Sequence, residues 1–460
     1  MKRCCYLLLT ALLLMLASTA SAATSGNFKY EIKGNGTATI TGYSGASDEN
    51  IIIPQMVDGY TVAAIGDKAF YKDEKNRKIG ISVTLPESVK SIGDFAFWNA
   101  NVTSINLPDG LESIGKGVFV GCDEIVYRVS ANHPMFAVID GALYNKAKKE
   151  LIQGKEGASI PEGIRIIGDY ACYGISKCGI QQGRMALPST IEEIGDYAFF
   201  GIRKFGFYGF GDAQQSQSWG ENLRKIGAHA FENAIVGNAD VEESIFQIPD
   251  SVEEIGESCF KNFDVLAKMR GRGVVSIGPE SKLRNIPDKA FYNDEMFANR
   301  NNDMYIRCDA PISSIGEYAF SGHWGRIIEK INLEHIESIG KYAFDDACIP
   351  FLVKIPGSCK VISEGAFRNA VSTIVRDRVS VNRIELSDGI EKIESHAFEN
   401  SAIQQPVYLP ESLEDIAMDA FDPDCQFTVE KGSYAYRWAN ENAYNCTVNG
   451  EEQNLDWLNN

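Results

Sequence analysis

Few side chains in this sequence have the types and spacing that catalysis requires. No nucleophile elbow, glycine-rich phosphate loop or His-Glu-x-x-His metal motif occurs in its 460 residues. His229 and His396 take a spacer position that other parts of the chain fill with Asp, Lys or Tyr, so we expect both to be ordinary exposed side chains. The other histidines fall at scattered places: His133, His323 and His335. The sequence therefore predicts a protein that is not an enzyme.

Cysteine offers little metal or redox chemistry. Nine of the eleven cysteines follow a leader segment, and no pair of Cys-x-x-Cys units indicates a zinc site. Three of them stand where other copies of a repeat place apolar residues, which predicts buried free thiols: Cys172, Cys259 and Cys359. Cys425 and Cys446 flank a predicted helix, and both a disulfide between them and two free thiols remain open.

The charge of the chain is acidic, with 44 Lys and Arg against 62 Asp and Glu and a net charge of -18. This balance argues against nucleic acid and anionic membranes, which both attract basic patches. Asp422-Pro423-Asp424 is acidic but lacks the spacing of a calcium loop, so we interpret it as a turn. We expect no cofactor, and we interpret the charge mainly as a source of solubility.

Side chains suited to recognition are more plentiful. The segment from 199 to 219 is dense in aromatic residues, and Phe205 and Phe207 are predicted to lie in the core. Tyr208, Phe210 and Trp219 are instead candidates for exposed rings that stack on a sugar or a protein partner. A second candidate loop runs from 292 to 307, with a merely solvated connection as the alternative.

A column of outward residues is the other candidate for partner binding. These residues stand just before the last aliphatic residue of each predicted strand: Thr84, Asn106, Ser159, Ala186, Gln247, Asn332, Lys354, Glu385 and Tyr408. Solenoids recognise partners through such columns. Asn106, Gln247, Asn332 and Tyr408 are the candidate contacts, and plain solvation of the column is equally open.

A nine-residue phrase, repeated thirteen times, must position these side chains. It reads aliphatic residue (once Cys), two spacers, Ile, three spacers, a usually small residue, then Phe. Its anchors are Ile65, Ile92, Ile114, Ile167, Ile194, Ile226, Ile255, Ile286, Ile315, Ile339, Ile362, Ile393 and Ile416. Twelve phrases end in Phe five residues later, the exception being Cys172, and nine have Gly directly after the Ile. We expect that Gly in a tight turn, where it allows backbone angles or contacts that other residues cannot make.

Each repeat is too short to enclose its own apolar side chains, so it must stack on its neighbours. The sequence predicts a β-rich leucine-rich-repeat solenoid of about thirteen rungs with irregular insertions, in which each Ile and Phe of the phrase is buried. Residues 1–22 have the pattern of a signal peptide with a small-x-small site at Ala20-Ser21-Ala22. We expect an N-terminal cap over 23–50, the solenoid over 51–421 and a C-terminal cap over 422–460.

The predicted C-terminal cap contains a short helix. Ser433 is placed to cap its first turn, and Tyr434 and Trp438 are four residues apart, so they share a face. An open solenoid must cover its last apolar rung, because that face would otherwise associate with other molecules. We therefore expect the two rings to lie across that rung, and the segment to be structural.

The run from Leu85 to Phe97, and its kin at 187–199 and 248–260, resemble the BspA-like leucine-rich-repeat family of secreted bacterial surface proteins. Residues 132–144 are similar to an inserted hairpin of that family, and 431–442 to its terminal helix. The resemblance implies a secreted or cell-surface protein that binds an extracellular protein in adhesion or matrix contact. An exported carbohydrate-binding protein that uses the aromatic insertions is the alternative.

Overall fold

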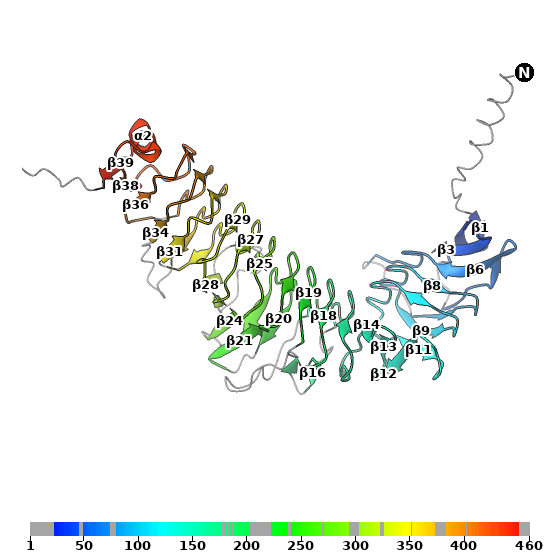
Figure 1. Cartoon of the computed structure of the whole chain (residues 1–460). Coiled ribbons are helices and arrows are strands. Elements are labelled where there is room, and N and C mark those ends of the chain that lie inside the picture. Colours follow the sequence, from blue (N-terminus) through cyan, green and yellow to red (C-terminus); the bar gives the residue numbers. More distant parts are fainter. Residues whose placement is uncertain are drawn as a thin grey trace, which may run out of the picture. The chain divides into compact units, whose positions relative to one another are not determined.

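The computed structural model describes most of the chain. The described residues are 23–45, 49–73, 80–175, 180–181, 184–185, 187–202, 222–237, 241–268, 271–293, 303–322, 326–350, 352–372, 383–401 and 403–449. The chain divides into two compact units, residues 1–155 and 156–460, which we describe separately. Figure 1 shows that both units consist of strands joined by short turns.

The first unit contains two sheets and a hairpin. One sheet runs in the order β1 (Ala23–Ser25), β2 (Phe28–Ile32), β3 (Thr37–Tyr43), β6 (Tyr60–Ile65), β8 (Ser91–Ile92) and β10 (Ser113–Ile114), with β5 (Met56–Val57) paired to β6. The other runs in the order β11 (Val126–Val129), β9 (Val102–Leu107), β7 (Ile81–Thr84) and β4 (Asn50–Ile52). β1 to β3 pair antiparallel, whereas β3 and the later strands of the repeats pair parallel, as successive rungs must.

The predicted hairpin is confirmed by three antiparallel strands, β12 (Phe136–Ile139), β13 (Ala142–Asn145) and β14 (Glu150–Gln153). Asp140 and Gly141 turn between the first two strands with φ of 49° and 80°, which suits a two-residue hairpin loop. His133 is fully buried beside it. Its Nε2 lies 2.9 Å from the Pro108 carbonyl, and its Nδ1 accepts the Phe136 N–H at 3.1 Å. This histidine therefore fastens the hairpin to the repeat before it.

The second unit stacks the two-residue strands that end at the anchor Ile of each phrase, which we call the narrow sheet (Figure 1). It consists of two paired runs. The first run is β15 (Ile166–Ile167), β18 (Glu193–Ile194), β19 (Lys225–Ile226) and β22 (Glu254–Ile255), and the second is β25 (Asn285–Ile286), β27 (Ser314–Ile315), β29 (Ser338–Ile339), β32 (Val361–Ile362), β35 (Lys392–Ile393) and β37 (Asp415–Ile416). Consecutive anchors pair with each other in parallel, for example Ile286 with Ile315 and Ile315 with Ile339. Within each run the anchors therefore lie in one row.

Longer strands of the same repeats form what we call the broad sheet. Its order is β21 (Glu243–Ile248), β24 (Arg272–Ile277), β26 (Asp303–Cys308), β28 (Arg326–Ile331), β30 (Cys348–Ile349) and β33 (Val371–Ser372). Smaller parallel groups are β20 (Ile235–Gly237) with β23 (Asp264–Leu266), β31 (Leu352–Ile355) with β34 (Arg383–Leu386), and β36 (Val407–Leu409) with β38 (Gln426–Val429) and β39 (Asn445–Val448). β16 (Ile180–Gln181) and β17 (Arg184–Met185) pair antiparallel.

The apolar side chains of the phrase make the core that the repeat predicts. Twelve of the thirteen anchor Ile residues are buried, and so are all twelve Phe residues and Cys172. Ile114 differs from the prediction, because it is only half-buried. From Phe199 to Phe421 nine rings stack at centroid distances of 5.0–5.6 Å. Burial of each ring contributes roughly 1.5–3 kcal/mol to the free energy of folding.

A residue with left-handed backbone angles stands two positions before the end of nearly every phrase. In twelve of the thirteen phrases the third spacer has φ between 54° and 61°, although only Gly117 and Gly365 are glycine there. Rings at this position stack on those of the next rung, as Tyr197 does on Tyr170 at 4.8 Å and Tyr342 on Tyr318 at 5.1 Å. Stacking of neighbouring rungs thus offsets the cost of a conformation that bulky residues seldom adopt.

The two spacer histidines belong to this left-handed column, so the prediction of ordinary exposed side chains is wrong. His229 has only 25% of its side chain exposed, stacks on Tyr197 at 4.4 Å, and places Nδ1 2.5 Å from Glu232. His396 is half-buried, with Nδ1 3.1 Å from Glu399 and Nε2 3.4 Å from Asp419. Both rings are structural parts of the turn.

Close contact between turns explains the glycine that follows most anchors. Gly227 lies so near the preceding turn that a Cβ would stand 2.6 Å from the backbone nitrogen of Asp196. The same Asp196 accepts the Ala228 N–H with Oδ1 at 2.8 Å. Of the two reasons expected for this glycine, close contact is therefore the one that applies here. Similar Asp bonds join other turns, such as Asp94 N–H to Asp67 Oδ1 at 2.8 Å.

The helix α2 (Tyr434–Glu441) follows the last repeat. As predicted, Ser433 caps it, because its Oγ accepts the Tyr436 N–H at 3.0 Å. Trp438 is buried and packs on Phe421 at 6.3 Å and on Phe427 at 5.8 Å. The ring of Trp438 thus covers the end of the Phe stack, whereas Tyr434 is only half-buried.

Candidate partner-binding surfaces

The outer side of the broad sheet carries the most ordered group of charged and aromatic side chains that we find among the described residues. We call it the Arg–Tyr cluster, and its members are Glu243, Arg272, Tyr305, Arg307 and Glu329. They come from β21, β24, β26 and β28, four consecutive strands of the sheet. A parallel register with Val274 opposite Tyr305 and Ser276 opposite Arg307 holds the backbone positions fixed.

Glu329 joins the two arginines because of a bulge in its strand. Ile306 pairs with Ile328 and Arg307 with Lys330, so Glu329 is an extra residue on β28. A bulge redirects a side chain. Glu329 accepts Arg272 Nη2 at 2.6 Å and also pairs with Arg307 Nε.

The remaining contacts make the cluster rigid. Arg307 Nη2 lies 3.0 Å from Glu243 Oε1, two strands away. The Arg272 guanidinium carbon lies 4.1 Å from the centre of the Tyr305 ring, which is a cation–π contact. The arginine side chains are 37% and 29% exposed, so a partner can reach them.

Electrostatics keeps these groups ionised. The hydrogen bond from Arg307 to Glu329 raises the pKa of the guanidinium above its ordinary value. Burial raises the pKa of Glu329, but hydrogen bonds from Arg307 and Arg272 lower it further, and the net pKa lies below the ordinary 4.5. Both shifts favour the charged forms of Arg307 and Glu329, so this ion pair is maintained at neutral pH.

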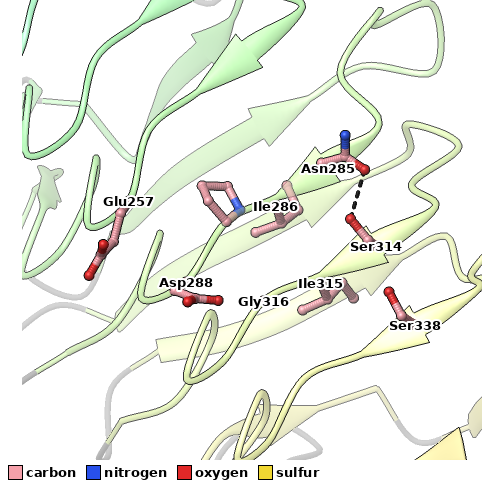
Figure 2. Close-up of a pocket in the computed structure, with 9 residues that line it drawn as sticks. Glu257, Asn285, Ile286, Asp288, Ser314, Ile315, Gly316 and Ser338 are labelled. Carbon is pink, nitrogen blue, oxygen red and sulfur yellow. Dashed lines mark hydrogen bonds between the residues drawn. The ribbon is translucent and has the colours of Figure 1, made fainter.

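A second surface lies on the narrow sheet, where nine residues line an open hollow of about 420 Å³. Figure 2 shows these residues as sticks. Its polar residues on consecutive strands are Asn285, Ser314 and Ser338, which we call the polar window. Ser314 Oγ donates to Asn285 Oδ1 at 2.7 Å. Glu257 and Asp288 border the hollow on the turn side.

The described column residues mostly use their polar groups inside the protein. The side-chain amide of Asn106 donates to the Leu85 carbonyl at 2.9 Å and accepts the Leu85 N–H at 2.7 Å. It therefore takes the place that the backbone of a neighbouring strand would have beside Leu85. Gln247 Nε2 donates to the Ile248 carbonyl at 3.1 Å, and Tyr408 Oη to Glu430 at 3.4 Å. These bonds fix the orientation of the side chains but leave part of each exposed.

Asn332 does not stand in the strand column where the sequence placed it. β28 ends at Ile331, and the residue on β28 in register with Arg307 is Lys330. Asn332 instead begins a turn, in which its Oδ1 accepts the Glu334 N–H at 3.0 Å. Asn332 therefore falls just beyond the end of the strand, which the sequence pattern did not reveal.

The aromatic candidates Tyr208, Phe210 and Trp219, with Phe205 and Phe207, lie outside the described residues, as do Ala186, His323 and the leader. Of the candidate loop 292–307, residues 294–302 also lie outside them. Its last part is strand β26 rather than loop, and it supplies Tyr305 and Arg307 to the cluster.

The cysteines follow the prediction with one exception. Cys259 and Cys359 are buried and free, and burial raises the pKa of the Cys359 thiol to about 11. Cys172 is buried but disulfide-bonded, so the prediction of a free thiol is wrong there. Cys425 and Cys446 are both free, so no disulfide joins the strands around the helix. In the described part of the chain, no three His, Cys, Asp or Glu side chains gather as a metal site would require.

The arginines of the cluster were missed because sequence spacing was judged one strand at a time. Arg272 lies in a Gly-rich run that we interpreted as a loop and strand, and Glu329 is visible only once the bulge is known. A usable signal existed. Glu243, Arg272 and Asp303 begin successive strands with alternating charge, and they pair in register.

Comparison with protein families gives one match that covers most of the chain. The model described as the BspA type leucine-rich repeat region matches in six copies, at residues 43–147, 155–206, 201–295, 240–374, 284–427 and 375–449. A search of curated proteins found no match. Among the described residues, no helix has the length and apolar character needed to cross a membrane.

Several solved structures are similar at low identity. A leucine-rich repeat protein from Bacteroides ovatus is 18% identical, over 93% of this chain and 99% of that one, with a TM-score of 0.42. One from Eubacterium ventriosum is 16% identical, over 84% and 95%, with a TM-score of 0.40. A leucine-rich cell surface protein from Faecalibacterium prausnitzii is 17% identical, over 95% and 97%, with a TM-score of 0.36.

Proposed function

We propose that the chain, which belongs to the BspA-type leucine-rich repeat family, is an exported binding protein that attaches to an extracellular host or matrix protein. The family supports a binding role rather than a catalytic one. The leader-like residues 1–22 support export to the cell surface or beyond. The chemistry of the Arg–Tyr cluster is the reason for proposing a protein as the partner.

The cluster supports protein binding because of its residue types. Tyr and Arg are enriched among the few residues that carry most of the binding energy of an interface. Arg272 and Arg307 present planar guanidinium groups, which suit the carboxylates and carbonyls of a protein partner. Half-buried Ile327, opposite Tyr305 on the next strand, adds apolar surface.

The rigidity of the cluster also favours binding. A free arginine loses rotamer freedom when it is bound, which costs affinity. Here Arg272 is already held between Tyr305 and Glu329, so little further ordering is needed. The residues Asn106, Gln247, Asn332, Tyr408, Tyr208, Phe210 and Trp219 remain proposed additional contacts.

Binding to a panel of purified matrix proteins, measured by biolayer interferometry, tests this proposal. We expect saturable binding to at least one protein, and at least about tenfold weaker binding after the double change Arg272→Ala and Tyr305→Ala. Lys354→Ala is the matched control, because it also removes an exposed cation with a Glu partner, 2.9 Å away in this case.

Two results would overturn the proposal. No saturable binding to any protein of the panel would refute matrix attachment. Binding that survives the double change, in a protein with an unchanged unfolding midpoint, would show that the cluster is not the contact.

A further inference from the structure

The polar window interrupts a charged column. At two other places on the narrow sheet, side chains just before the anchors form ion pairs with the next rung: Glu193 with Lys225 at 3.5 Å and Lys392 with Asp415 at 3.2 Å. At β25, β27 and β29 the same position holds an amide and two hydroxyls. The window thus presents uncharged polar groups, between Glu254 on β22 and Val361 on β32.

The window has unused hydrogen-bonding capacity. Asn285 Oδ1 accepts Ser314 Oγ, but Asn285 Nδ2 and Ser338 Oγ have no hydrogen-bond partner within the described part of the chain. Asp288 Oδ1 accepts the Glu317 N–H at 2.7 Å, which leaves Oδ2 available. Glu257 supplies a further carboxylate at the edge of the hollow. Figure 2 shows the carboxylates of Glu257 and Asp288 on one side of the hollow, and Asn285, Ser314 and Ser338 on the other.

The floor of the hollow adds a small apolar surface. Pro287 stands where most phrases have glycine, and its ring is half-buried beside Gly316, which has no side chain. The three strands are spaced by about 4.8 Å, so a ligand along the row meets equivalent groups at regular steps. A polymeric ligand made of similar units could contact such a row with each unit in turn.

We propose that the polar window binds a neutral oligosaccharide that lies across β25, β27 and β29. Sugar hydroxyls both donate and accept, so they can satisfy the amide of Asn285, the hydroxyl of Ser338 and the carboxylates of Glu257 and Asp288 together. An anionic ligand would be repelled by the two carboxylates. The CH groups of a sugar ring would rest on Pro287. This site is separate from the Arg–Tyr cluster and goes beyond the proposed attachment to protein.

Titration calorimetry with soluble β-glucan, mannan and galactan oligosaccharides tests this site on the full chain. We expect saturable binding to at least one of the three, and binding at least tenfold weaker after the double change Asn285→Ala and Ser338→Ala. The side chains are exposed, so the unfolding midpoint should stay within the range of harmless surface changes. Lys225→Ala is the matched control, because it lies on the same column outside the window, and it should bind as the unchanged protein does.

Two further measurements separate this site from the attachment to protein. Arg272→Ala with Tyr305→Ala should leave sugar binding unchanged. The proposal is overturned if none of the three sugars binds, or if the double change in the window leaves sugar binding intact. If no sugar binds and the double change in the window abolishes binding of a matrix protein, the window is a protein contact and the proposal is overturned.

Discussion

At the scale of single residues, the phrase constrains a few positions very tightly and leaves others free. Its Ile and Phe follow from burial alone, which is why the sequence predicted them with one exception, Ile114. The left-handed third spacer could not be predicted, since ten of its twelve residues are not glycine. A different signal was missed: ten phrases place Asn, Asp or Gly with positive φ two residues after the Phe slot.

The stack of rings makes a specific prediction at Phe320. Its ring lies 5.3 Å from that of Phe291 and 5.4 Å from that of Phe344. Phe320→Ala should destabilise the second unit by about 3–5 kcal/mol, because it removes buried surface and leaves a cavity. Chemical denaturation measures this change. Met418→Ala, at a residue that is 77% exposed, should change stability by less than about 0.5 kcal/mol. Equal effects of the two changes would show that the stack is not packed as described.

Glu232 predicts a pH dependence. Burial raises its pKa, but hydrogen bonds from His229 and Lys261 lower it more, so the folded pKa lies below the ordinary 4.5. A carboxylate with a lowered pKa contributes stability that is present above the unfolded pKa and lost as the pH falls through the folded one. Glu232→Gln should therefore lower the melting temperature near pH 7, and the difference from the unchanged protein should shrink below pH 4.5. A difference that stays constant with pH would contradict this assignment.

At the scale of elements, strand pairing and turns were predictable in kind but not in register. The hairpin at 136–145 and the capped helix at 434–441 agree with the sequence, because turn and cap residues report local geometry. The bulge at Glu329 depends on the neighbouring strand, so a single strand's alternation could not reveal it. For the same reason the Arg–Tyr cluster was overlooked.

Close contact between turns predicts a cost for adding one methyl group. Gly227→Ala should destabilise the second unit by about 1–3 kcal/mol, because the new Cβ would lie 2.6 Å from the Asp196 nitrogen and the turns must separate. Gly34→Ala is the control, because a Cβ added there would have no atom within 4 Å. Thermal unfolding compares the two, and equal midpoints would refute the contact argument.

The helix α2 predicts the effect of truncation. Ending the chain after Asp424 removes Trp438 and exposes the ring of Phe421 at the end of the stack. We expect fast hydrogen exchange around Leu413 to Phe421, or association of the truncated protein. Trp438→Ala should produce a milder form of the same fraying. A truncated protein that stays monomeric with these residues protected would show that the helix is not a cap.

At the scale of the whole molecule, the repeat determines the scaffold, but not which of its surfaces a partner would contact. Thirteen copies of one phrase were enough to predict stacked rungs and the family. The side chains proposed to contact a partner were harder to predict, because they come from strands that are distant in the sequence and become neighbours only in the fold. Glu243 and Arg307 are 64 residues apart and still form an ion pair.

Site-specific photo-crosslinking tests the central claim most directly. A photoreactive phenylalanine analogue replaces Tyr305 in one protein and Tyr318, a half-buried ring of the left-handed column, in another. Each is mixed with the matrix protein that the chain binds, and crosslinked products are identified by mass spectrometry. We predict crosslinks from position 305 and none from position 318. Crosslinks from 318 alone, with the partner still bound, would contradict the assignment of the Arg–Tyr cluster as the contact surface.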